Sequence, residues 1–312
     1  MTSLQSLLGI ELAIIQAPMA GVQGSALAVA VSNAGALGSL PCAMLGLEAM
    51  RDELVAIKAQ TLKSFNVNFF CHTPPTPNAE REAVWRTTLS PYYQEFGLDV
   101  STVPVGPGRG PFSHEAADVL SEIRPAVVSF HFGLPSPELL ARVRTWGAKI
   151  LSSATTVEEA RWLESHGVDA IIAQGLEAGG HRGTFLSEDL TRQVGTFALV
   201  PQIVRAVKTP VIAAGGIADA KGVAAALALG AAGVQIGTAY LLCSLLRCTP
   251  KETITPIHAN NPGTQKLQCP TPKTASITIA MKVKTEIVIA VLRNRSTNAL
   301  FISILIPYIK YF

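Results

Sequence analysis

Residues 170–183 read AIIAQGLEAGGHRG, a short apolar run followed directly by a turn rich in glycine. A continuous apolar run of this length is typical of a strand buried on both faces of a parallel sheet. Residues 197–207 then have the apolar period of a helix, and a further apolar run follows at 211–214. The stretch therefore predicts a strand, a glycine-rich turn, a helix and a second strand in that order.

The same alternation extends outward from Ile14 to Leu241. Eight apolar runs alternate with segments of helical period over about 230 residues, which favours an α/β fold of the TIM-like (β/α)8 barrel type. An open doubly wound sheet is the alternative, because one sequence does not show strand order. The predicted strands are 14–18, 36–40, 64–70, 126–132, 149–153, 170–174, 211–214 and 233–238. The predicted helices are 25–32, 47–63, 113–123, 136–146, 157–166, 197–207 and 219–229.

The composition of the 312-residue chain changes near Cys243. Residues 1–243 hold 16 Lys and Arg against 20 Asp and Glu, whereas residues 244–312 hold nine against two, so the net charge of +3 averages two unlike sequences. The first part also holds 24 of the 25 glycines. We expect a barrel domain over 1–243 and an atypical basic tail over 244–312, unassigned to any fold, with disorder as one interpretation.

Composition also excludes several classes of protein. A chain that is 48% hydrophobic and 15% charged is neither a disordered segment nor a coiled coil. No basic stripe with interleaved aromatics is present, so no nucleic-acid partner is expected. Five scattered cysteines without a C-x-x-C pair predict no metal site and a reducing, cytoplasmic location. The apolar run 299–309 is far shorter than the roughly 20 residues of a membrane helix, so no membrane partner is expected, and the oligomeric state is left open.

The residues after the apolar run 170–173 can carry chemistry, because side chains at the carboxyl ends of barrel strands form the active site. Gln174 can both donate and accept hydrogen bonds at the edge of a heterocycle. Gly179 and Gly180 let a flat ligand or a phosphate approach the backbone. The ordinary pKa of His181, about 6.5, suits proton transfer near neutrality, although a loop histidine can equally be solvated or structural.

Glycines also follow the seventh and eighth predicted strands. Gly215 and Gly216 follow one, and Gly237 precedes Thr238 at the end of the other. Loops at these two positions commonly bind phosphate in barrels, so the sequence predicts a phosphate site with the Thr238 hydroxyl as a donor. Asp219 is expected to cap the helix that follows.

Three further strand ends contribute candidates. Pro18 and Met19 end the first strand, where a ring could lie across the chain or where the proline simply stops the strand. Asn68 on the third strand needs a ligand or a neighbouring strand as partner. His131 on the fourth is either a core histidine or a ligand-facing one. The acidic pair Glu158 and Glu159 is interpreted as solvated charge at a helix start.

Residues 71–111 are too many for a simple strand-to-helix connection and are rich in proline. A long loop on this face could cover a substrate, or it could be a surface insertion without a role.

In these segments the chain resembles the nitronate monooxygenase family, formerly 2-nitropropane dioxygenase, most of all its class I group. The strand-six motif is the most specific of the matches, because glycine pairs alone occur in many phosphate-binding barrels. The matching segments are QAPMAG (16–21), VSNAGALG (31–38), NVNF (66–69), SFHFG (129–133), QGLEAGGHRG (174–183), AAGGI (213–217) and QIGT (235–238).

The resemblance implies FMN as the cofactor and the oxidation of alkyl nitronates, such as propionate 3-nitronate, by molecular oxygen. It implies catalytic roles for His181, as the base or as a charge-stabilising donor, and for His131, and it suggests Tyr92 or Tyr93 at the edge of the substrate. The residues implied in FMN binding, together with the glycines beside them, are Met19, Asn68, Gln174, Gly179, Gly180, Gly215, Gly216, Gln235, Ile236, Gly237 and Thr238.

The tail departs from this resemblance. Family members continue after the eighth strand with helices that close the barrel, and residues 244–312 do not match them. We therefore expect a barrel that lacks the usual closing helices. An out-of-frame or alternatively spliced end is one hypothesis for the change, and transcript sequence across the codon for Cys243 tests it.

Two other functions stay open at this point. A related FMN barrel could reduce a quinone or an enoyl thioester with NAD(P)H. Alternatively, the chain could be an inactive barrel whose tail is not functional.

Overall fold

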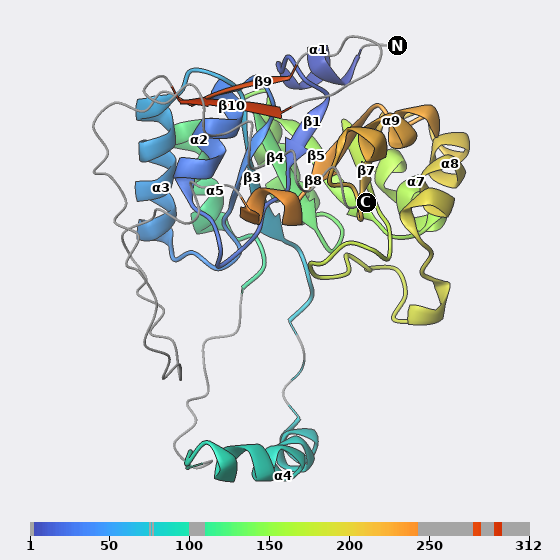
Figure 1. The fold of residues 1–312 in the computed structure, drawn as a ribbon. Helices are drawn as coiled ribbons and strands as arrows, with labels where there is room; N and C mark the ends of the chain where they lie inside the picture. The colour runs from blue at the N-terminus through green and yellow to red at the C-terminus, as the bar shows by residue number, and fades with distance from the viewer. Residues whose placement is uncertain are drawn as a thin grey trace, which may run out of the picture.

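A computed structural model describes residues 3–74, 76, 78–99, 110–242, 277–281 and 290–294. Eight strands and the helices between them form the body of the molecule, with the helices outside the strands (Figure 1). The strands are β1 (Ile14–Gln16), β2 (Gly38–Pro41), β3 (Phe65–Phe70), β4 (Val127–His131), β5 (Lys149–Ala154), β6 (Ala170–Gln174), β7 (Val211–Ala214) and β8 (Gly233–Ile236). The surrounding helices are α2 (Ser25–Asn33), α3 (Leu47–Gln60), α5 (His114–Ile123), α6 (Pro137–Arg144), α7 (Val157–Ser165), α8 (Thr196–Ala206) and α9 (Ala220–Ala228).

The strand order confirms the barrel and excludes the open sheet. All eight strands are parallel, in the order β1-β8-β7-β6-β5-β4-β3-β2. The two ends of this sheet meet at a parallel bridge between Ile15 and Leu37. There the Gln16 N–H donates to the Leu37 carbonyl and the Leu37 N–H donates to the Ile14 carbonyl, both at 2.9 Å. The carboxyl ends of all eight strands therefore lie around one rim.

The apolar residues of the strands separate into two clusters. Side chains such as Ile15 and Leu151 point inward and fill the barrel interior. A larger cluster, which includes Leu54 and Leu163, lies between the strands and the helices. Helix α1 (Leu4–Leu8), which the sequence did not predict, adds Leu4 and Leu8 to the inner cluster. Burial on both faces explains why the strands read as continuous apolar runs.

The predicted element boundaries and the cap at Asp219 are confirmed. Strand boundaries agree with the predicted ones to within two residues, and α3 ends at Gln60 rather than at residue 63. The side chains of Ser136, Thr156 and Asp219 cap α6, α7 and α9 by accepting a main-chain N–H. Gly147, Gly167 and Gly230 follow α6, α7 and α9 with positive φ, which glycine adopts without strain.

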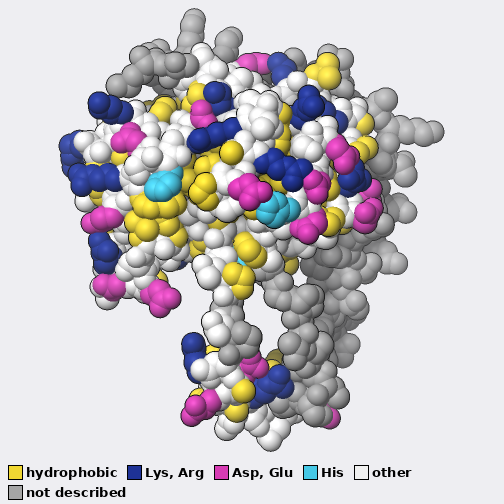
Figure 2. Space-filling view, turned by 180° about the vertical axis from the view of Figure 1, so that it is seen from behind, with side chains coloured by type: hydrophobic (Ala, Val, Ile, Leu, Met, Phe, Trp, Pro, Cys, Tyr) yellow, Lys and Arg dark blue, Asp and Glu magenta, His cyan; other side chains and the backbone are white. Residues whose placement is uncertain are grey.

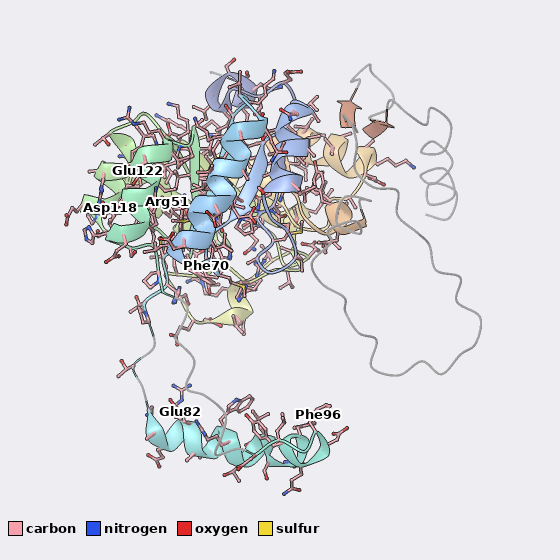
Figure 3. All side chains as sticks on the ribbon, turned by 90° about the vertical axis from the view of Figure 1, so that its left-hand side faces the viewer. Arg51, Phe70, Glu82, Phe96, Asp118 and Glu122 are labelled. Carbon is pink, nitrogen blue, oxygen red and sulfur yellow. The ribbon has the colours of Figure 1, made fainter. Side chains whose placement is uncertain are left out.

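Ion pairs on the surface link neighbouring helices of the outer ring. Arg51 on α3 pairs with Glu122 on α5 (Figure 3). Asp118 on α5 pairs with Arg142 on α6. Acidic and basic side chains are interspersed over the face of the molecule in Figure 2. Among the described residues, no helix is long and apolar enough to cross a membrane.

The expected loop 71–111 contains a helix, α4 (Ala79–Glu95), which the sequence did not predict. The Asn78 side chain caps it by accepting the Arg81 N–H at 2.8 Å. Figures 1 and 3 show α4 standing away from the barrel, and none of its residues is buried. Without a buried face, α4 has no apolar period from which it could have been predicted.

Four short elements complete the described chain: the 3-10 helices η2 (Leu190–Arg192) and η3 (Thr238–Leu242), and the strands β9 (Ile277–Met281) and β10 (Ala290–Asn294). The last two pair antiparallel with each other. The remainder of the predicted tail, 244–312, lies outside the described residues, so the expectation that closing helices are lacking stays a prediction.

Packing of α2 on β2 yields a prediction for stability. A Cβ at Gly38 would lie 2.0 Å from the main-chain oxygen of Ala28, which cannot move without shifting α2. Gly38→Ala should lower the free energy of unfolding by about 3 kcal/mol, measured by chemical denaturation. Gly110→Ala is the control, because no atom lies within 4 Å of that Cβ position, and it should change stability by less than about 0.5 kcal/mol. Equal effects of the two substitutions would contradict the packing described.

Candidate active site

A cavity of about 650 Å³ opens at the carboxyl ends of the barrel strands, within the usual range for small-molecule sites. All but one of the catalytic and FMN-binding residues predicted from the sequence line it. They are Met19, Asn68, His131, Gln174, Gly179, Gly180, His181, Gly215, Gly216, Gln235, Gly237 and Thr238. The exception is Ile236, whose side chain is buried in the outer cluster and whose carbonyl accepts the Ala17 N–H.

The loop that follows β6 is held by the side chain at the end of that strand. The Gln174 Oε1 accepts the Gly183 N–H at 2.8 Å, and the Gln174 Nε2 donates to the His181 carbonyl at 2.9 Å. Gln174 thus fixes the main chain on both sides of Arg182. The sequence suggested the edge of a heterocycle as the partner of this amide, whereas here both of its polar atoms bind the loop.

Arg182 closes the same loop from the other direction. Its guanidinium donates to the carbonyls of Gly175 and Gln174, and its Nε donates to Gln193 Oε1 at 2.7 Å. The charged side chain therefore ties the end of β6 to residues that precede α8. The turn needs this support because its glycines contribute no packing of their own.

Glu159 anchors the continuation of the loop, which corrects its interpretation as a solvated charge. The side chain is 1% exposed and accepts the N–H of Thr155 at 2.6 Å and that of Phe185 at 2.8 Å. Its neighbour Glu158 is exposed, as expected, and pairs with Arg192 at 3.0 Å. The spacing from Thr156 to Glu159 is that of a capping box, the sequence signal that could have identified the buried member of the pair.

His131, at the end of β4, has a partner for each ring nitrogen. Nδ1 lies 2.9 Å from the Ser153 hydroxyl, and Nε2 lies 2.9 Å from the His181 carbonyl oxygen. Burial, followed by the charges of His181 and Arg182, lowers the pKa of His131 from 6.5 to about 4, although the hydrogen bond to the carbonyl opposes this shift. His131 is therefore neutral at pH 7.

His181 stands at the edge of the cavity with an exposed side chain. Its ring makes edge contacts with Phe70 at 5.4 Å and with Phe132 at 6.2 Å between centroids. Phe70 is the last residue of β3, and Phe132 directly follows β4. The two rings restrict the orientation of the imidazole, which remains exposed at the edge of the cavity.

Sequence reasoning missed two residues of this aromatic cluster. Phe132 has φ +66°, a conformation that costs a non-glycine residue on the order of 1–3 kcal/mol and that often occurs at functional sites. His72 packs 6.1 Å from Phe132, and its Nδ1 is buried without a hydrogen-bond partner among the described residues. No motif contains His72, so only its position after β3 could have suggested it.

Three main-chain N–H groups beyond β7 are left without a protein acceptor in the part of the chain that the structure describes. Gly215 and Gly216 have φ of +122° and +69°, a turn that side-chain-bearing residues rarely adopt. Across the described residues, the N–H groups of Gly216, Ile217 and Ala218 have no protein acceptor, and all three residues line the cavity. A Cβ at Gly179 would lie only 3.7 Å from the Thr238 hydroxyl, so the β6 and β8 loops meet beside this site.

The nearby N-terminus of α8 is already occupied by a carboxylate. Glu177 accepts the Thr196 N–H at 2.7 Å and the Thr196 hydroxyl at 2.8 Å. Burial of Glu177 opposes ionisation, but the hydrogen bonds outweigh it and lower its pKa. Because Glu177 already binds the start of α8, the free main-chain N–H groups near it are those of residues 216–218.

Polar side chains on β3 and β8 also line the cavity. The Asn68 Nδ2 donates to the Ser129 hydroxyl at 3.0 Å, which provides the neighbouring-strand partner that the sequence required. The Gln235 Oε1 is buried and accepts no hydrogen bond from any described residue. Among the residues that the structure describes, no group of three or more His, Cys, Asp or Glu side chains could hold a metal ion.

The two tyrosines suggested for the edge of the substrate do not reach the cavity. Tyr92 and Tyr93 lie on α4, away from it.

Comparison with known proteins assigns the chain to a family. The family model described as nitronate monooxygenase matches residues 1–273. The chain belongs to the nitronate monooxygenase family. The match continues beyond Cys243, so it does not stop where the composition changes.

Individual relatives agree with this family. A nitronate monooxygenase of Paraburkholderia phytofirmans is 45% identical over 247 residues, which cover 78% of this chain and 66% of the relative. One of Pseudomonas aeruginosa is 45% identical over 241 residues, covering 76% and 68%. The chain thus spans about two thirds of the length of these nitronate monooxygenases.

Solved structures also share the barrel. The nitroalkane oxidase of Streptomyces ansochromogenes has a TM-score of 0.67 and 39% identity, covering 77% of this chain and 68% of its own. FabK of Thermotoga maritima has a TM-score of 0.57 and 31% identity, covering 77% and 63%.

The environment of His131 predicts a dependence of stability on pH. Its pKa is about 4 in the folded chain and 6.5 in the unfolded one, so the unfolded state takes up the proton first as the pH falls. Between pH 7 and pH 5 the folded state should lose up to about 2 kcal/mol, less where solvent screens the ring. Chemical denaturation of the unaltered chain and of His131→Gln at both pH values measures this loss. The loss should be smaller in the variant, and equal losses would show that His131 is not buried as described.

Proposed function

We propose that the chain catalyses FMN-dependent oxidation of alkyl nitronates, such as propionate 3-nitronate, by molecular oxygen. The observation that carries the proposal is the position of His181, whose exposed imidazole borders the same cavity as the free main-chain N–H groups of Gly216, Ile217 and Ala218. Membership of the nitronate monooxygenase family supports the substrate class. The reaction is inferred from the names of the relatives, and the role of each residue is inferred from its position in the cavity.

The cavity fits FMN in three respects. Its volume suits a ligand of that size. The free N–H groups of Gly216, Ile217 and Ala218, with the Thr238 hydroxyl, would hold the phosphate. The unpaired Gln235 Oε1 would accept a hydrogen bond from a ring N–H, which removes the cost of a buried acceptor without a partner. When bound, FMN supplies the one-electron oxidation chemistry.

The protein's own groups would bind and orient the substrate. A nitronate is an anion and has already lost its α proton, so it needs hydrogen-bond donors more than a base. The His181 imidazole can donate to the nitronate oxygens, and it can accept the α proton when the substrate is a neutral nitroalkane. Phe70 and Phe132 beside His181 exclude water from one side of this position.

Oxygen uptake by the purified full chain tests the reaction. With FMN and propionate 3-nitronate, uptake should exceed that of FMN alone. His181→Asn should lower kcat for a neutral nitroalkane by about 10²–10⁴-fold, because the amide cannot act as a base, and should lower kcat for the nitronate far less. His166→Asn is the matched control, since this histidine is stacked on Trp162 at the surface.

Three outcomes would contradict the proposal. A yellow protein without oxygen uptake would overturn the oxidation while leaving FMN binding intact. Flavin reduction by NAD(P)H without any nitronate turnover would support the reductase alternative. A colourless protein that takes up no FMN would support the inactive barrel.

The role of Gln235 gives a separate prediction for cofactor affinity. Gln235→Leu removes the buried acceptor and leaves a ring N–H without a partner, so the Kd for FMN should rise about tenfold. Quenching of flavin fluorescence measures the Kd. Gln202→Leu is the control, because Gln202 is exposed on α8 and bonds only to the Ala198 carbonyl. An unchanged Kd in Gln235→Leu would remove this residue from the FMN site.

A further inference from the structure

We propose that His131 is a positioning residue and not an acid or base: its Nε2–H holds the main-chain carbonyl of His181 and so fixes the loop that presents the His181 imidazole. This inference rests on the proposed function and deepens it, because it gives the two histidines of the site different tasks. The resemblance had placed both among the catalytic residues.

The hydrogen bonds of His131 assign its tautomer. A carbonyl oxygen can only accept, so the contact of 2.9 Å from Nε2 to the His181 oxygen requires the proton on Nε2. Nδ1 then carries a lone pair, which accepts the Ser153 hydroxyl at 2.9 Å. Both ring nitrogens are therefore occupied within the protein, and neither is free to exchange a proton with a substrate.

The surroundings of His131 keep this neutral tautomer in place. The charged or titratable groups that act on the ring are His181 and Arg182, both from the β6 loop, and both oppose a positive charge on it. Phe132 and Phe70 pack against it at 4.5 and 5.8 Å between centroids. A Cβ at Gly183 would lie 2.7 Å from His131 Cε1, so the loop and the ring are in direct contact.

The His181 carbonyl is held from two sides. Besides His131 on β4, Gln174 on β6 donates to the same oxygen at 2.9 Å. With both donors present the loop has little freedom at His181. Removal of the His131 donor leaves the Gln174 bond, so the loop should stay folded while the imidazole loses its fixed position. The effect is expected in kcat more than in the fold.

Two substitutions separate positioning from proton transfer. A glutamine amide can place an N–H where Nε2 lies, yet it cannot take up or release a proton near neutral pH. His131→Leu should lower kcat for a neutral nitroalkane about 30-fold with a smaller change in KM, and His131→Gln should recover most of that loss. If Gln and Leu lower kcat equally, His131 acts as an acid or base and the proposal is overturned.

A spectroscopic measurement tests the tautomer without any turnover. In the full chain labelled with ¹⁵N-histidine, the His131 resonances at pH 7 should show a protonated Nε2 and an unprotonated Nδ1. His131→Leu, but not His131→Gln, should shift the resonances of His181. A protonated Nδ1 or an imidazolium at pH 7 would overturn the proposal. Because this result does not require nitronate oxidation, failure of the proposed function and failure of the positioning role can be told apart.

Discussion

The parallel bridge between Ile15 and Leu37 is the constraint on which the rest of the molecule depends. It joins the first and second strands and so converts an eight-stranded sheet into a closed barrel. Closure brings loops distant in sequence to one rim: Met19 after β1, His181 after β6 and Thr238 after β8 line the same cavity. An open sheet with the same strands would leave these residues in a row.

The loop after β6 carries most of the polar interactions at this rim. Its glycines allow the main chain many conformations, and side chains from β4, β6 and α7 hold it in one of them. Gln174 and His131 bind the His181 carbonyl, and Glu159 on α7 binds the N–H of Phe185. Residues 215–216 contact the first part of this loop at Glu177 and Ala178, and residues 216–218 offer main-chain N–H groups instead of side chains. Precise placement therefore comes from side chains on rigid elements, while the loops that line the cavity present glycines and one exposed imidazole.

The barrel could be predicted because its strands are buried on both faces, which makes them continuous apolar runs. The site could be predicted because glycine and polar residues follow those runs at strand ends. Helix α4 could not, since none of its residues is buried and no apolar period marks it. The tautomer of His131 and the hydrogen bond from the Phe185 N–H to Glu159 depend on contacts between segments far apart in sequence, which local pattern does not contain. The capping-box spacing from Thr156 marks Glu159 only at the start of α7. At Ile236 the local motif suggested the cofactor site, but side chains alternate along β8. Gln235 therefore faces the cavity and the Ile236 side chain lies in the core.

The central claim is that the cavity holds FMN with its phosphate at the loops after β7 and β8. Titration of the purified full chain with FMN and with riboflavin, followed by flavin fluorescence, tests it most directly. FMN should bind with one-to-one stoichiometry and about 100-fold more tightly than riboflavin, because hydrogen bonds to a charged group contribute more than those to a neutral one. Equal affinity for the two flavins, or binding of neither, would contradict the account.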